Sequence, residues 1–275
     1  MFRPQAKRPS RIRSGFEFLE LIYHATIRNL RKSHGNAVYG MVMSVIQASL
    51  ILAIFVVMFW VLGLKDSPIV GGDFILYVMS GVFMFLTHTK AMGAVSGADG
   101  PTSAMMMHAP MNPVVAVVSA ALAALYQQVF AMGVIMLFYH TLWTPIHIHE
   151  PVGMMAMLLL SWFSGAAIGL MFYAAKPWQP EFVGLLSMIY QRANMIASGK
   201  MVVASMLPAS RRALFDWNPL FHTIDQARGH MFLNYHPRYT SADYAIKVAL
   251  ICILIGLMAE FYTRRHASLS WGKRQ

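Results

Sequence analysis

The sequence has few charged residues and only one cysteine. Asp, Glu, Lys and Arg make up 12% of the 275 residues, against roughly 25% in an average soluble domain, whereas 57% of the residues are hydrophobic. This composition argues against a soluble fold. Cys252 lies in an apolar run, and a single cysteine supports neither an intrachain disulfide nor a metal cluster held by thiolates.

The chain also lacks the GxxxxGK[ST] signature of a nucleotide-binding loop. Ser198-Gly199-Lys200-Met201 comes closest, but it has neither the upstream glycine nor the hydroxyl that would bind magnesium. If ATP drives this protein, another chain binds it. No other set of residues has the pattern of a hydrolytic or group-transfer site, so we predict no catalytic residue and no cofactor in this chain. Residues 1–13 are basic without a short apolar core behind them, so no cleaved signal peptide is expected.

The remaining charge is unbalanced, with a formal net charge of +11. In a membrane protein this excess indicates contact with anionic lipid headgroups or the positive-inside bias of cytoplasmic segments. Nucleic-acid binding is the weaker interpretation, because the basic residues flank apolar runs instead of forming a solvated patch with stacking aromatics.

The apolar runs predict an all-α membrane protein in which residues 1–275 form one membrane domain with six spans. Each span needs about 20 apolar residues. A loop with one short helix is expected over residues 92–112, and a polar, aromatic connection over residues 205–243. The predicted spans are residues 37–64, 74–91, 113–142, 152–175, 180–204 and 244–262.

Residues 16–33 predict an amphipathic helix that lies in the membrane surface. Apolar side chains recur there every three or four residues, opposite a face with Glu17, Glu20 and Arg28. A helix packed on a soluble domain would show the same pattern, but no soluble domain follows. The apolar face comprises Phe16, Leu19, Tyr23, Ile27 and Leu30.

Basic residues before the first span and after the last predict that both termini are cytoplasmic. The connection between the fifth and sixth spans is then external, although it carries Arg211, Arg212, Arg228 and Arg238, which the positive-inside rule disfavours there. Either the span count is wrong or these arginines have a function outside.

Two further groups of polar residues have competing interpretations. His147, His149 and Glu150 alternate along an extended segment and could bind a metal ion, but histidines beside prolines are more often part of a solvated turn, so we predict no metal. Arg192 lies inside the fifth apolar run, where a charge costs at least about 2.5–3.5 kcal/mol. It should face protein or water, either in a substrate path or paired within the structure.

Three stretches resemble the membrane subunits of ABC-type capsular polysaccharide and O-antigen exporters. A Met-rich segment ends in Pro110-Met111-Asn112-Pro113, and Gln191-Arg192 is followed by Ser198-Gly199 and Leu207-Pro208. The most specific stretch begins at Asn218-Pro219-Leu220 and contains His222, Asp225 and Arg228, which matches the pattern NPLxHxx[ED]xxR before the last span.

The resemblance implies a homodimer in the bacterial inner membrane with two ATPase subunits that use ATP and Mg, together with periplasmic and outer-membrane export proteins. It implies re-entrant helices before the last span and a polysaccharide substrate. The implied coupling residues are Thr102, Ser103, Met105, Met106, Met107, His108, Pro110 and Pro113. The implied substrate-path or outer-gate residues are Arg192, Arg211, Arg212, Asn218, Pro219, His222, Asp225 and Arg228.

Two other functions remain open. A drug or lipid exporter subunit would belong to the same superfamily. A membrane-embedded glycan- or lipid-modifying enzyme could use His222, Asp225 and Arg228, since residues three apart share a helix face. We favour a structural role for these three residues, as hydrogen-bonding anchors of a gate helix, over catalysis.

Overall fold

The computed structural model describes residues 11–32, 35–64, 66–99 and 112–271, and all regular structure in these ranges is helical. Asparagine or aspartate side chains cap several helix starts: Asn36, Asp73, Asn112 and Asn218 each accept a hydrogen bond from a backbone N–H of the first turn. The helices are α1 (Arg11–Lys32), α2 (Ala37–Val61), α3 (Phe74–Ser96), α5 (Pro113–Leu142), α6 (Pro151–Ala175), α7 (Pro180–Ala197), η1 (Ala204–Met206), α8 (Ala209–Arg212), α9 (Pro219–Met231) and α10 (Ala242–Trp271).

Five of the described helices are long and apolar enough to cross a membrane: α2, α3, α5, α6 and α10. The prediction of an all-α protein with several spans is therefore confirmed. α7 is not among the five, so a sixth span at this position stays a prediction. Residues 205–243 contain η1, α8 and α9.

The predicted fifth span is wrong in its extent, because α7 ends at Ala197 and not at Ala204. Gly199 has a φ of +67°, a left-handed conformation that only glycine adopts without strain, and it turns the chain out of the helix. The carbonyl oxygens of Gly199 and Lys200 accept hydrogen bonds from Arg228, and Gly199 O also accepts one from the backbone N–H of Val202.

Other predicted boundaries also need correction. The last helix, predicted as a span over residues 244–262, is α10 and extends from Ala242 to Trp271. α1 begins at Arg11, before the predicted start at Phe16, and α3 continues through Met92 to Ser96, which we had assigned to the loop. α2 ends at Val61, where Gly63 with a φ of +76° follows. By contrast, the predicted range 113–142 agrees with α5.

The bundle is organised around α3 and α6, which pack along each other, while α10 packs on α6 and α5 packs on α3 and α1. α3 is the central helix: 72% of the residues in its most apolar window are buried, against 17% for α10. Glycine lets α3 and α6 approach closely, since a Cβ at Gly165 would overlap the backbone carbonyl of His88 and one at Gly169 would lie 2.7 Å from the Met92 oxygen.

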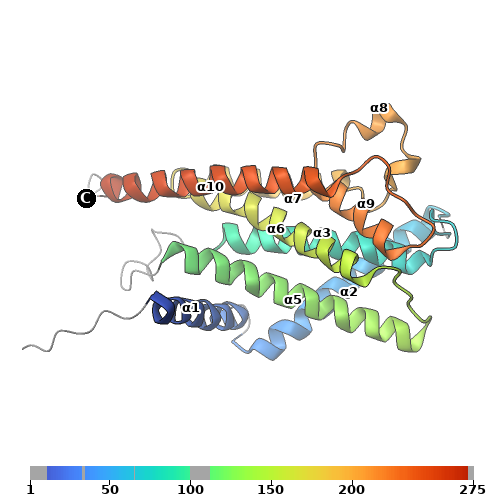
Figure 1. The fold of residues 1–275 in the computed structure, drawn as a ribbon, viewed down its shortest axis with the longest axis horizontal. Coiled ribbons are helices and arrows are strands. Elements are labelled where there is room, and N and C mark those ends of the chain that lie inside the picture. The colour runs from blue at the N-terminus through green and yellow to red at the C-terminus, as the bar shows by residue number, and fades with distance from the viewer. Residues whose placement is uncertain (1–10, 33–34, 65, 100–111, 272–275) are drawn as a thin grey trace, which may run out of the picture.

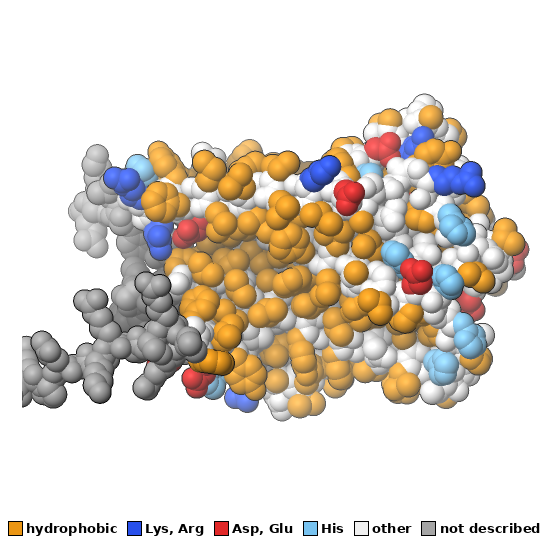
Figure 2. Space-filling model, in the orientation of Figure 1, with side chains coloured by type: hydrophobic (Ala, Val, Ile, Leu, Met, Phe, Trp, Pro, Cys, Tyr) orange, Lys and Arg blue, Asp and Glu red, His pale blue; other side chains and the backbone are white. Residues whose placement is uncertain are grey.

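The bundle has two distinct ends, visible in Figure 1. The α1 end holds α1, the start of α5 and the C-terminus. The α8 end holds α8, α9 and the connections from α2 to α3 and from α5 to α6. Apolar side chains cover much of the surface between the two ends on the face shown in Figure 2, as expected for helices that contact lipid.

α1 joins the bundle only through its second half. Ala25 and Leu30 are buried, and the Asn29 amide donates to Ser119 Oγ of α5 at 3.0 Å. Arg28 and Lys32 both approach the carboxylate of Asp99 just after α3, at 3.6 and 2.9 Å. Phe16 and Leu19 in the first half, and Tyr23 just beyond it, remain more than 60% exposed, which suits a helix whose apolar face lies in a membrane surface.

We expect Gly165→Ala to destabilise the protein by about 1–3 kcal/mol, because the new methyl group forces α6 away from α3. Thermal unfolding of the purified chain in detergent measures this change. Gly133→Ala in α5 is the matched control, since a Cβ there meets no atom within 4 Å. Equal melting temperatures for the two variants would contradict the close α3–α6 contact.

Candidate functional site

The four polar residues of the Asn-Pro-Leu motif lie on or beside α9, a 13-residue helix packed against α6, α10 and α3. Asn218 forms the start of this helix. Its Oδ1 accepts from the backbone N–H of Leu220 at 3.0 Å, and its Nδ2 donates to Asn194 Oδ1 at 2.7 Å and to the Ala197 carbonyl at 2.9 Å. Pro219 occupies the first helical position, where a missing N–H has no cost. Asn218 thus joins the start of α9 to the end of α7.

Arg228 is completely buried and binds backbone carbonyls. Its Nη1 donates to Gly199 O at 3.1 Å and Val202 O at 2.8 Å, and its Nη2 donates to Lys200 O at 2.5 Å. The guanidinium also contacts α3, where Nε donates to Ser80 Oγ at 3.3 Å and the ring of Tyr77 lies 4.3 Å from Cζ. A planar group with five donors is suited to this arrangement, and lysine is not.

Asp225 occupies the same helix and receives three hydrogen bonds. The donors are the backbone N–H of Ala204 at 3.2 Å, the Tyr235 hydroxyl at 2.6 Å and the Thr240 hydroxyl at 2.8 Å. Burial, together with the Asp225 carboxylate, raises the pKa of Tyr235, so its hydroxyl remains a donor at neutral pH. Asp225 therefore connects α9 to η1 and to the segment before α10.

His222 holds the start of α10. Its Nδ1 accepts from the backbone N–H of Ser241 at 3.0 Å, and its Nε2 lies 2.8 Å from the Asp216 carbonyl, which accepts a hydrogen bond. These partners assign a neutral imidazole with the proton on Nε2. The Tyr244 ring packs on it with centroids 4.5 Å apart.

Asn218, His222, Asp225 and Arg228 form one unit, which we call the α9 anchor. None of the four is more than 6% exposed. Each binds a different segment: the end of α7, the start of α10, the chain around η1, and the turn at Gly199 with α3. The anchor therefore determines how the chain folds between α7 and α10.

A second buried polar cluster joins α3, α6 and α7. His88 is fully buried, with Nδ1 3.1 Å from Ser164 Oγ and Nε2 3.0 Å from the Tyr190 hydroxyl. Ser161 of α6 donates to Thr223 Oγ1 of α9 at 2.8 Å, which links this cluster to the anchor helix.

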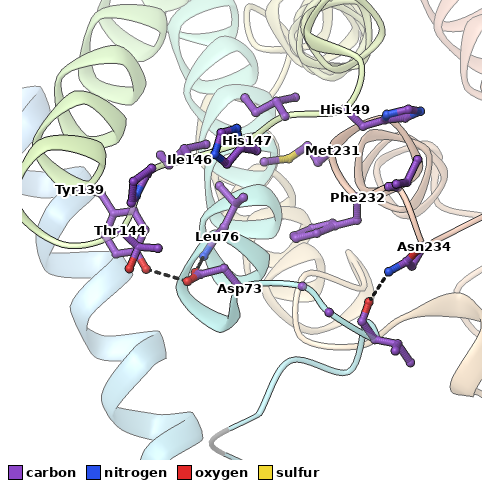
Figure 3. A pocket seen from close by; sticks show the side chains of 16 residues that line it. Asp73, Leu76, Tyr139, Thr144, Ile146, His147, His149, Met231, Phe232 and Asn234 are labelled. Carbon is purple, nitrogen blue, oxygen red and sulfur yellow. Dashed lines mark hydrogen bonds between the residues drawn. The ribbon is translucent and has the colours of Figure 1, made fainter.

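A cavity of about 440 Å³ opens at the α8 end (Figure 3). Asp73 lies on its wall, where its carboxylate accepts from Tyr139 at 2.9 Å and from the Leu76 N–H at 2.8 Å. His147 and His149 also line it, together with Phe232. The cavity thus combines polar groups with an aromatic face.

A second cavity, of about 500 Å³, opens beside α1 between α3 and α5. Lys32 and Lys90 line it, and each ammonium group already has one partner: Asp99 Oδ1 at 2.9 Å for Lys32 and Gln47 Oε1 at 2.8 Å for Lys90. Small residues of α3 and α5 form its floor. The other polar residues that line it are Asn29, Thr89, Gln127 and Gln191.

The family model for the ABC-2 type transporter matches residues 20–232, from α1 through the α9 anchor. The chain belongs to this family. Its five apolar helices and this membership make it a multi-pass membrane protein, the membrane component of an ABC-2 transporter. No curated protein matches the chain significantly.

The coupling residues that we predicted for this ABC-2 component lie mostly outside the described residues. This holds for Thr102, Ser103, Met105, Met106, Met107, His108 and Pro110. Pro113 is described and occupies the first position of α5, directly after the capping residue Asn112. The predicted coupling segment therefore leads straight into the helix against which α1 packs.

The predicted substrate-path residues do not form one site. Asn218, Pro219, His222, Asp225 and Arg228 lie together, whereas Arg192 is exposed on α7. Arg211 is exposed on α8, and the Arg212 guanidinium stacks 3.7 Å from the Tyr239 ring centroid.

Sequence reasoning missed two buried polar residues, His88 and Lys200. Lys200 is 2% exposed and lies with its ammonium group 3.8 Å from the Phe85 ring centroid. His88 interrupts a long apolar run, and Lys200 follows one. A polar or charged residue at such a position indicates a specific partner in the interior, so the sequence contained a signal for both residues.

Glu150 and His230 pair at 2.7 Å, which links the α5–α6 connection to the end of α9. Among the residues that the structure describes, no group of three or more His, Cys, Asp or Glu could hold a metal ion. His147 and His149 instead contribute to the α8-end cavity.

We expect Arg228→Lys to destabilise the protein by about 2 kcal/mol or more, because a lysine satisfies fewer of the buried carbonyls. The melting temperature in detergent measures the loss. Arg238→Lys, at an exposed arginine of the following segment, is the control and should melt like wild type. An Arg228→Lys variant as stable as wild type would show that the anchor carries little of the stability.

Proposed function

We propose that this ABC-2 component is the membrane-spanning subunit of an ATP-driven exporter that moves capsular or lipid-linked polysaccharide across the bacterial inner membrane. In this proposal two copies assemble with two ATPase subunits, which bind ATP and Mg. The α1 end faces the cytoplasm, both termini are cytoplasmic, and periplasmic and outer-membrane proteins take over the polymer.

The α9 anchor carries the proposal. The residues that resemble polysaccharide exporters most specifically are the four that hold α9 in place between α7 and α10. A short buried helix held in this way, beside spans and before the last one, is suited to be a re-entrant gate element on the outer side.

Charge supports the proposed orientation. The α1 end carries five basic residues: Arg28 and Lys32 of α1, Lys176 directly after α6, and Arg264 and Arg265 near the end of α10. Basic residues favour the cytoplasmic side. Arg228, which seemed to break this rule in the sequence, is buried and bound to carbonyls, so it does not count as a loop charge.

The cavity beside α1 supports an anionic, lipid-linked substrate. Lys32 and Lys90 each retain hydrogen-bond donors beyond their one partner, since an ammonium group has three. The amides of Asn29, Gln127 and Gln191 add further polar groups. Phosphates at the membrane surface would find both charge and hydrogen bonds there.

In the proposed mechanism, the ATPase moves the segment before α5. Because α5 packs on α1, α2 and α3, its displacement would be transmitted to the core of the bundle. ATP shifts the population between closed and conducting arrangements only if the segment contacts the two ATPase states differently.

The geometry favours an anchoring role for His222, Asp225 and Arg228 over catalysis. Both imidazole nitrogens of His222 are bonded to backbone groups, and Asp225 already receives three hydrogen bonds. A general base would need an open side toward the substrate. A drug or lipid exporter subunit is the second candidate, since family membership alone does not distinguish it.

We expect the chain to co-purify with an ATPase subunit that carries a nucleotide-binding loop. We also expect alanine substitution of Met105, Met106 and Met107 to weaken the stimulation that this chain exerts on ATP hydrolysis by that subunit. Pull-down and phosphate release measure these effects. Alanine substitution of three exposed α10 residues, Leu254, Met258 and Phe261, is the control and should leave the rate of ATP hydrolysis unchanged. An isolated chain that modifies glycan or lipid without an ATPase would contradict the proposal.

We also expect Arg211→Glu together with Arg212→Glu to reduce export of an acidic polysaccharide, because the reversed charges repel the polymer at the exit. Polymer on the cell surface, measured at equal expression, tests this. Arg238→Glu is the control for a general change of surface charge. Unchanged export in the double variant would show that the α8 arginines do not contact the polysaccharide.

A further inference from the structure

A narrow groove of about 230 Å³ runs between α5, α6 and α10, away from the cavities described above. On the face shown in Figure 2 the surface is hollowed between α10 and α5, and apolar side chains line the hollow. Val118 of α5, Phe163 of α6 and Leu257 of α10 represent the three walls. We call it the α5–α10 groove.

The walls of the α5–α10 groove offer almost no hydrogen bonds. Trp162 lines it, but its indole N–H already donates to the Ala121 carbonyl at 2.7 Å. The other wall residues are Val, Ala, Leu, Ile, Phe and Pro, apart from one glutamate. Whatever occupies the groove therefore presents hydrocarbon to it.

The exception among the wall residues is Glu260 of α10. Its Oε1 is buried and has no hydrogen-bond partner among the described residues. The ion pairs of Arg28 and Lys32 at this end of the bundle are made with Asp99 and not with Glu260. A buried carboxylate oxygen without a donor is costly, so this position calls for a cationic donor from outside the chain.

Neighbouring residues place Glu260 at the depth of lipid headgroups. Trp178 and Tyr262 stack with ring centroids 5.8 Å apart, and the Trp178 indole donates to Thr263 Oγ1 at 2.8 Å. Paired Trp and Tyr at the end of a span are typical of the membrane–water interface. Arg264, exposed one turn beyond Glu260, agrees with this depth.

We propose that the α5–α10 groove binds one acyl chain of a phospholipid whose headgroup ammonium donates to Glu260. The apolar walls take the chain, and the carboxylate at the headgroup level takes the amine. An ethanolamine headgroup has three N–H donors and a positive charge, whereas a choline headgroup has the charge but no N–H. The lipid is therefore phosphatidylethanolamine, and phosphatidylglycerol, which lacks a cation, is disfavoured.

The test uses the full-length chain in nanodiscs that contain equal amounts of phosphatidylethanolamine, phosphatidylcholine and phosphatidylglycerol. After the chain is repurified in mild detergent, native mass spectrometry quantifies the lipids that stay bound. Glu260→Gln should reduce the ratio of bound phosphatidylethanolamine to phosphatidylcholine about tenfold, as expected for the loss of a charged hydrogen bond. Glu181→Gln, at an exposed carboxylate that starts α7, is the control and should keep the wild-type ratio.

A second pair of variants tests the groove itself. Leu257→Trp fills the groove from its rim and should abolish the retained phosphatidylethanolamine, whereas Met258→Trp, at the next residue and outside the groove, should not. Three results would overturn the proposal: an unchanged lipid ratio in Glu260→Gln, full retention in Leu257→Trp, or preferential retention of phosphatidylglycerol by wild type. None of these outcomes depends on which substrate the transporter moves.

Discussion

The hydrogen bonds of the buried Arg228 guanidinium are the interaction on which the α8 end of this structure depends. The guanidinium donates hydrogen bonds to the carbonyl oxygens of Gly199, Lys200 and Val202 in the turn that follows α7. In the same place it contacts Ser80 and Tyr77 of the most buried span. Hydrogen bonds to neutral carbonyls keep the charge inside the protein without a counter-ion in contact. Asp225, three residues earlier, binds donors from η1 and from the segment before α10.

The α9 anchor explains why the motif requires particular residue types without a catalytic role for them. Each of its four polar side chains forms hydrogen bonds with groups in another segment, so the geometry of those bonds determines which residue fits. Asparagine is required to cap α9 and bond to α7 at once, and a neutral histidine is required to accept from Ser241 and donate toward Asp216. ABC-2 membrane components normally work with an ATPase partner, and a rigid element of this kind suits the fixed end of the bundle in the proposed mechanism.

The helices were predictable where local signals decide them. Asn112 and Pro113 mark the start of α5, and the apolar run to Leu142 gives its length, so prediction and structure agree there. The end of α7 has a local signal in Gly199, which we did not use to end the fifth span. The hydrogen bond from Arg228 to Gly199 joins residues 29 positions apart, and the local sequence pattern does not show it. The Asn-Pro-Leu motif identified the four residues of the α9 anchor, but most of their hydrogen-bond partners are distant in sequence and could not be predicted from the motif. The role of Glu260 depends on an unpaired oxygen at a groove between three helices, and periodicity contains no information about that.

The two ends of the bundle differ in the chemistry they offer. The α1 end combines lysines and amides with a helix that exposes apolar side chains, whereas the α8 end combines the anchor with a cavity of polar and aromatic groups. This asymmetry suits a protein that receives an anionic, lipid-linked polymer on one side and releases it on the other. Transport in proteoliposomes that contain this chain and its ATPase tests that claim most directly. The account predicts that labelled polysaccharide crosses the membrane only with ATP, and ATP-driven movement of a lipid or drug without polysaccharide would contradict it.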